Sequence, residues 1–178
     1  MSTYTPGPAN LAHIEKDGDN WTLVLVRELK HAPDKVWSAL VDPAQLREWA
    51  PFDADGSLAT TGSKAKLTTI GAPPEYATSE TTVVKADAPR ELVYNWGGFD
   101  MRWQLEALGE GTRLTLWTTI DRRYMAMGAA GWQICFDVLD HLLDGNPLGR
   151  MAGPTTMEME GWQRLTKEYA AQFRVEGE

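Results

Sequence analysis

The chain has little of what disulfide, metal or membrane chemistry requires. Its 178 residues include a single cysteine, Cys135, and three histidines. One cysteine excludes an intramolecular disulfide, so we predict a reducing, cytoplasmic location. No apolar run approaches the ~20 residues that a membrane-spanning helix needs. The first residues also lack the basic segment and apolar run of a secretory signal, so we predict neither a leader nor a membrane span.

Positive charge is also scarce. The chain carries 17 Lys and Arg against 25 Asp and Glu, which gives a formal net charge of -8. A nucleic-acid-binding protein usually presents a basic face, and an anionic membrane surface attracts one as well. We therefore predict no nucleic-acid partner, and we interpret the acidity as an aid to solubility.

Length and apolar content favour one packed domain with extensions at both ends. Apolar residues make up 43% of the chain, enough for a sizeable core. Residues 1–18 are rich in proline, glycine and polar side chains and predict a flexible arm. Residues 19–145 carry the periodic patterns of the domain. Residues 146–178 predict a linker and an additional C-terminal helix.

The first two thirds of the domain predict one strand, two short helices and then several strands. The β-branched run at 21–29 indicates the first strand, and Pro33 and Asp42 are placed to open short helices after it. Further strands are expected at 63–70, 78–86, 91–96, 101–105 and 113–120. Because turns separate them at hairpin spacing, we expect a mostly antiparallel sheet.

A long amphipathic helix is expected next. Its apolar stripe, spaced at about 3.6 residues, comprises Trp132, Cys135, Phe136, Leu139 and Leu143. The opposite side carries Asp137, Asp140, His141 and Asp144, which we interpret as a solvated charged face. Gly145-Asn146-Pro147 ends this helix. The additional helix beyond the linker has its own apolar stripe of Trp162, Leu165, Tyr169 and Phe173.

Several short motifs along the chain point to one family. They are Arg27, Ala32-Pro33, Val36-Trp37, Leu40, Asp42-Pro43, Leu46, Trp49, the 87–96 segment, the 111–116 segment and Gly131-Trp132. Together they resemble the motifs of the START-like and polyketide cyclase-like superfamily, in its bacterial branch related to the activator of the heat-shock-protein-ninety ATPase. The resemblance implies an α+β helix-grip fold, in which a curved antiparallel sheet wraps around the long C-terminal helix. It covers about residues 20–145 and is more specific for fold than for function.

No catalytic or metal-binding constellation emerges from the sequence. His141 and Asp137 have i, i-4 spacing, but spacing supplies no third ligand, so we predict no metal and no cofactor. Cys135 lies on an apolar stripe without a basic neighbour, which predicts a packed thiol. Asp53 and Asp55 lie in a loop-like stretch and are interpreted as surface residues. Whether the protein is an enzyme stays open.

Aromatic side chains are the most informative feature, because the chain contains 8 tryptophans. In a helix-grip fold the apolar faces of the strands at 91–96 and 101–105 converge on the long helix. We therefore predict seven ligand-binding residues in the space between sheet and helix: Trp49, Tyr94, Trp96, Met101, Trp103, Trp132 and Phe136. The alternative is that these residues only fill the core. Trp117 falls on the opposite face of its strand, where the arm or the last helix is expected to cover it.

Three functions follow from this pattern. The leading hypothesis is binding of a small apolar or aromatic molecule in the sheet–helix cavity. A second is a polyketide cyclase or aromatase-like enzyme, which needs an inward polar group. A third is a co-chaperone-like interaction module with a chaperone partner and a filled core. The sequence also leaves a homo-oligomer open. A cavity of several hundred Å³ favours the first two hypotheses.

Overall fold

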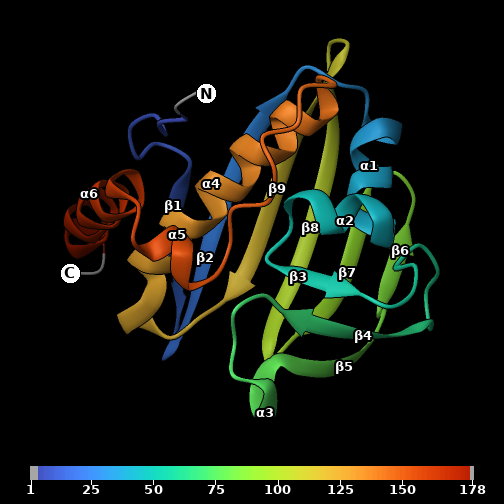
Figure 1. The fold of residues 1–178 in the computed structure, drawn as a ribbon, viewed down its shortest axis with the longest axis horizontal. Helices are drawn as coiled ribbons and strands as arrows, with labels where there is room; N and C mark the ends of the chain where they lie inside the picture. Colours follow the sequence, from blue (N-terminus) through green and yellow to red (C-terminus); the bar gives the residue numbers. More distant parts are fainter. Residues whose placement is uncertain (1–3, 177–178) are drawn as a thin grey trace.

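A six-stranded antiparallel sheet forms the main layer of the molecule (Figure 1). The structure is a computed structural model that describes residues 4–176. The strand order is β1-β2-β9-β8-β7-β6. The strands are β1 (Ala12–Asp17), β2 (Asn20–Leu29), β6 (Lys85–Asp87), β7 (Glu91–Trp96), β8 (Phe99–Leu108) and β9 (Gly111–Thr119). Met101, Trp103 and Leu105 of β8 are buried between exposed or half-buried neighbours, as their alternation predicts.

A smaller sheet and three helices lie at one end of this layer. The small sheet has the order β3-β4-β5. Its strands are β3 (Phe52–Ala54), β4 (Lys64–Thr69) and β5 (Thr78–Thr82), and the helices are α1 (Pro33–Val41), α2 (Pro43–Trp49) and α3 (Pro74–Ala77). Pro33 and Pro43 occupy the first turns of α1 and α2, where a missing amide proton is harmless. The Asp42 side chain caps α2 by accepting a hydrogen bond from the Ala44 amide at 3.1 Å.

The long helix α4 (Met125–Leu143) lies across one face of the large sheet, after a short 3₁₀ turn at Arg122–Tyr124 (Figure 1). Its predicted stripe is buried, with Phe136 and Leu139 fully covered. The α+β helix-grip architecture is therefore confirmed. The C-terminal extension adds α5 (Pro154–Met157) and α6 (Glu160–Glu176), and α6 packs against α4 and β1. Leu165, Tyr169 and Phe173 of α6 are buried, as their spacing predicts.

Two expectations about strands need correction. Within the predicted arm, residues 12–17 form strand β1, because Ala12 and Ile14 pack on the core while β1 pairs with β2. Residues 1–3 of that arm lie outside the described residues. The strand expected at 78–86 divides into β5 and β6, which belong to different sheets. The chain leaves the small sheet after the buried Val83, and the Val84 amide donates to Val93 of the large sheet at 2.9 Å.

The charged face of α4 is solvated at Asp144, as expected, but not at Asp137 and Asp140. Arg27 of β2 reaches this face and pairs with Asp137 at 2.7 Å and with Asp140 at 3.2 Å. All three side chains are at most 23% exposed. Trp117 is half-buried. The Arg102 guanidinium of the neighbouring strand lies 4.6 Å from its ring centroid and covers part of it.

Candidate ligand-binding cavity

A cavity of about 330 Å³ lies between the sheet and the first half of α4. The sheet contributes the ends of three strands, with Trp96 of β7, Phe99 of β8 and Thr118–Thr119 of β9. The helix side carries Tyr124, Met127, Gly128, Gly131, Trp132 and Cys135. Ile120 and Pro51 complete these two walls. The position is the one expected for a helix-grip cavity, and the volume falls within the range of small-molecule pockets.

A third wall comes from the C-terminal extension. It comprises Met151, Ala152, Gly153, Thr156, Met157 and Trp162. These residues were not predicted from the sequence to belong to the site. Met151–Gly153 lie in an irregular linker without periodicity, and the spacing of Trp162 indicates only that it belongs to the apolar stripe of α6. The high methionine content around the linker was the one available signal, because flexible thioethers often line adaptable apolar surfaces.

Among residues 4–176, no aspartate, glutamate, lysine, arginine or histidine lines the cavity. Its hydroxyl groups are partly engaged within the protein. The Thr118 hydroxyl donates to the Met101 sulfur at 3.2 Å, and the Thr119 hydroxyl accepts from the Asp100 amide at 2.9 Å. The Trp96 indole N–H donates to the Thr69 hydroxyl at 3.0 Å. Because an unpaired charge is costly to bury, this lining favours an uncharged molecule.

The seven predicted site residues come together, but they do so in two layers. Trp96 and Trp132 line the cavity, with ring centroids 6.0 Å apart. The other five, Trp49, Tyr94, Met101, Trp103 and Phe136, lie outside the cavity lining and are at most 2% exposed. Trp103 joins the layers, since its ring centroid lies 5.6 Å from that of Trp132 and 6.1 Å from that of Trp49. The five buried residues therefore support the rings of Trp96 and Trp132, which face the cavity.

Cys135 lies at the cavity wall but is only 3% exposed. Burial raises the pKa of its thiol to about 12, because the thiolate loses its hydration. At pH 8 we expect iodoacetamide to alkylate the folded protein at least about a hundredfold more slowly than the urea-unfolded protein. Mass spectrometry of quenched time points measures both rates. Equal rates would show that the thiol is exposed and ionisable.

The histidines do not enter the cavity lining. Among the described residues, His31, Asp140 and Asp144 form one group whose potential ligand atoms lie within 4.8 Å of one another. His31 pairs with Asp144 at 2.7 Å, and this hydrogen bond lowers the pKa of the Asp144 carboxyl. However, Arg27 and Lys30 pair with the same carboxylates at 3.2 and 3.7 Å. These cations weaken the negative potential that a divalent ion needs, so the absence of a metal site stays our prediction.

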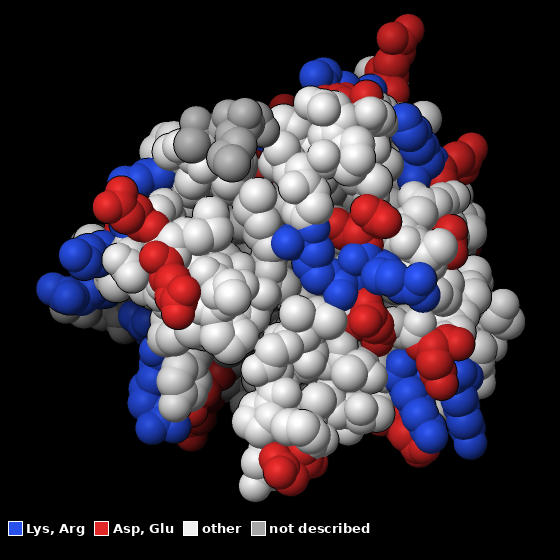
Figure 2. All heavy atoms as spheres, viewed as in Figure 1, with Lys and Arg blue, Asp and Glu red and all other residues white. Residues whose placement is uncertain are grey.

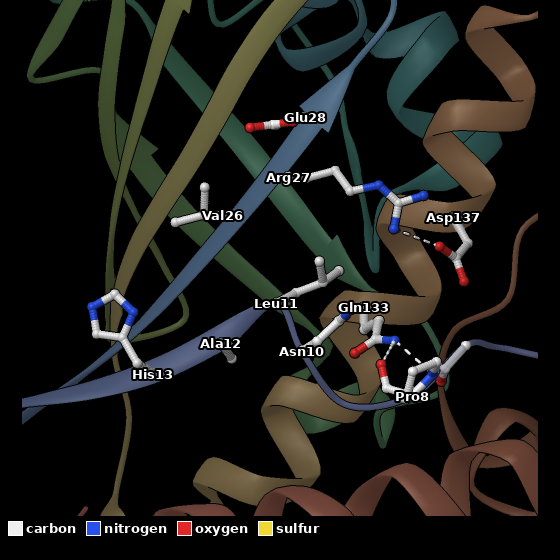
Figure 3. A pocket seen from close by; sticks show the side chains of 11 residues that line it. Pro8, Asn10, Leu11, Ala12, His13, Val26, Arg27, Glu28, Gln133 and Asp137 are labelled. Atoms are coloured by element: carbon white, nitrogen blue, oxygen red, sulfur yellow. Dashed lines mark hydrogen bonds and ion pairs between the residues drawn. The ribbon is translucent and has the colours of Figure 1, made fainter.

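A second, polar depression of about 670 Å³ lies between the N-terminal segment, β1, β2 and α4 (Figure 3). In this view Arg27 points from β2 toward Asp137, whereas Glu28 points the other way. Asp137 also accepts a hydrogen bond from the Tyr4 hydroxyl. The Gln133 amide donates to the Pro8 carbonyl at 3.1 Å. Because these groups are paired with one another, they tie the N-terminal segment to α4.

Charged side chains of both signs are interspersed on the face seen in Figure 2. Asp53 is half-exposed and pairs with Arg150 at 2.6 Å. Asp55 is exposed and accepts a hydrogen bond from the Lys66 amide at 2.7 Å. Both carboxylates lie at the surface, as expected. Within residues 4–176, no helix is both long enough and apolar enough to cross a lipid bilayer.

Comparisons with known proteins agree with this architecture. The family model described as "Activator of Hsp90 ATPase homolog 1-like protein" matches residues 30–144. Among solved structures, EF2215 from Enterococcus faecalis, a conserved protein of unknown function, has 12% identity over 90% of this chain and 89% of its own, with a TM-score of 0.69. CalU16 from Micromonospora echinospora has 16% identity over 98% and 97%, with a TM-score of 0.66.

A third structure is DynU16, a protein of the dynemicin biosynthetic locus. It has 20% identity over 74% of this chain and 50% of its own, with a TM-score of 0.61. At these identities the likeness to the three structures shows the shared fold alone. A comparison with curated protein sequences finds no significant match.

Proposed function

The chain belongs to the activator of Hsp90 ATPase homolog 1-like family, and on this premise we propose that it binds a small, uncharged apolar or aromatic molecule in the cavity between α4 and the sheet. The observation that carries the proposal is the cavity of about 330 Å³, which no charged side chain of the described part of the chain lines. Trp96 and Trp132 supply aromatic contact area there. A single-cysteine protein of this kind also fits the proposed cytoplasmic location.

Binding is favoured over the two other hypotheses. A cyclase-like reaction needs an inward acid or base, and the titratable lining residues in the part of the chain that the structure describes are Cys135 and Tyr124. The raised pKa of Cys135 disfavours its thiolate. A co-chaperone-like module is expected to expose a separate apolar patch. Instead, Phe99, Tyr124 and Met157, three of the six exposed large apolar side chains among the described residues, line the cavity.

A matched pair of fluorescent probes tests the proposal. N-phenyl-1-naphthylamine and its sulfonated analogue 8-anilino-1-naphthalenesulfonate share the same rings but differ in charge. We expect the neutral probe to bind one saturable site at least about tenfold more tightly, because the lining offers no cation to the sulfonate. Fluorescence titration measures both dissociation constants. Native mass spectrometry of the purified protein provides an independent search for a co-purifying ligand.

Trp96 is the residue whose replacement separates binding from folding. Trp96→Leu keeps an apolar side chain but removes the ring, so we expect about tenfold weaker binding of N-phenyl-1-naphthylamine. Trp117→Leu is the control, since Trp117 lies outside the cavity lining. Equal affinities of the two variants would place the probe elsewhere. The absence of saturable binding by the wild type would favour the interaction-module hypothesis.

A further inference from the structure

The segment from Met151 to Trp162, which we call the C-terminal wall, closes one side of the cavity. Building on the proposed binding function, we infer that this wall determines the size of the ligand, with Trp162 as the main specificity residue, and that the ligand is a compact aromatic molecule. The wall lies beyond residue 144, where the family match ends. One side of the cavity is thus formed by residues outside the matched family region, whereas its sheet and helix walls lie within that region.

Arg150 fixes the wall at its start. The guanidinium, 16% exposed, donates to the Asp53 carboxylate at 2.6 Å and to the Leu46 carbonyl at 3.0 Å. These contacts join the linker to α2 and β3, and Pro51 between those two elements lines the cavity. Because one charged group is hydrogen-bonded to two separate elements, the start of the wall is held in a fixed position relative to them.

A close backbone crossing fixes the wall again at Gly153. This glycine has a φ of +81°, and an added Cβ would lie 2.9 Å from the Ile70 carbonyl oxygen. On the other side, a Cβ added to Gly71 would lie 2.2 Å from the Pro154 Cδ. Only glycine permits both the conformation and the approach. The wall therefore presses directly against the turn that follows β4.

The side chains of the wall indicate the class of ligand. Met151 and Met157 join Met127 of α4 around the cavity, and Trp162 faces it from α6. Thioethers make favourable contacts with aromatic rings, and tryptophan offers a broad π surface. An aliphatic chain would gain burial but not these contacts. The volume of about 330 Å³ is near the lower end for ligand pockets, which favours a compact molecule.

An entrance is available without moving the wall. Phe99, Tyr124 and Met157 line the cavity and are 39%, 50% and 45% exposed. They come from β8, the turn before α4 and α5, so the cavity opens where these elements meet. A ligand can enter between them while Arg150 and Gly153 keep their contacts. The wall then acts as a fixed limit on ligand size.

The test compares a two-ring and a four-ring probe of similar polarity, 2-naphthol and 1-hydroxypyrene. In Trp162→Ala we expect the ratio of their dissociation constants to shift at least about tenfold in favour of 1-hydroxypyrene, because removing the indole enlarges the cavity. Leu165→Ala is the control, since Leu165 is buried on the same helix but does not line the cavity. It should leave the ratio unchanged. If the alanine variant does not fold, Trp162→Leu replaces it in the same comparison.

Gly153→Ala gives a second readout of the wall. We expect it to shift the same ratio in the same direction, because the added methyl group pushes the linker away from Ile70. A wild type that binds neither probe would refute the binding function itself. A wild type that binds 2-naphthol, with the same ratio in the Trp162 variants, would refute only the role of the wall. Binding of decanol as tight as that of 2-naphthol would refute the aromatic class.

Discussion

Trp103→Ala is expected to reduce the free energy of unfolding by about 3–5 kcal/mol, the range for deleting a large buried aromatic side chain. Trp103 is 1% exposed, and its ring contacts those of Trp49, Trp132 and Phe136 at centroid distances of 5.6 to 6.1 Å. Its indole N–H also donates to the buried Tyr94 hydroxyl at 3.2 Å. The substitution therefore leaves a cavity and an unpaired hydroxyl. Urea denaturation monitored by circular dichroism measures the change.

Trp117→Ala is the matched control for this prediction. Trp117 lies on the neighbouring strand, faces the other side of the sheet and is half-buried under Arg102. We expect less than half the loss in unfolding free energy, because a surface cation–π contact contributes only about 0.5–1 kcal/mol. Tyr94→Phe isolates the hydrogen bond and should cost about 1–3 kcal/mol. A Trp103 effect no larger than that of Trp117 would mean that the aromatic cluster does not support the core.

The sequence predicted those parts of the fold that have a periodic apolar face of their own. The alternation of Met101, Trp103 and Leu105 identified β8, and the stripe through Trp132 and Phe136 identified α4. Both patterns arise because one face of the element is buried along its whole length. Their combined order was sufficient to predict the helix-grip arrangement of sheet and helix.

Features that depend on tertiary contacts were missed. The prediction of a solvated face on α4 is wrong at Asp137 and Asp140, because Arg27, which pairs with both, lies on a strand distant in the sequence. The C-terminal wall was missed because a linker that packs through backbone contacts, such as that between Gly153 and Ile70, needs no periodic apolar residues. Strand β1 was visible in the alternation of Ala12 and Ile14, but the proline-rich start obscured it.

Tertiary contacts also decide which of the predicted site residues line the cavity and which are buried beside it. Sequence alternation shows that Trp103 and Trp96 share the apolar side of the sheet, but it does not show how far each lies from the end of the helix. The cavity opens at the first half of α4, where Gly128 and Gly131 leave space. Trp96 at the end of β7 reaches that space, whereas Trp103, in the middle of β8, packs beneath it. Small residues on α4 thus decide which aromatic residues remain free to contact a ligand.

Filling that space from the helix is expected to abolish binding while leaving the fold intact. Gly131 lines the cavity, and no atom lies within 4 Å of a Cβ added there. Gly131→Leu places a branched side chain in the cavity without a steric clash at its first carbon. We expect the affinity for N-phenyl-1-naphthylamine to fall at least about thirtyfold, because the probe must compete with a covalently attached side chain for the same volume. Fluorescence titration measures the loss.

The stability of the same variants shows whether lost binding reflects a filled cavity or a damaged protein. A helix with glycine at an interior position is less stable than the same helix with alanine there by about 0.5–1 kcal/mol. Gly131→Ala should therefore raise the free energy of unfolding by about that amount. We expect this variant to bind the probe nearly as well as the wild type. Gly128→Ala is the contrasting control, because its Cβ would meet the Ile120 Cδ1 at 2.9 Å. If Gly131→Leu is folded and still binds with wild-type affinity, the ligand occupies another site. If it binds weakly while remaining at least as stable as the wild type, occupation of this cavity is the cause.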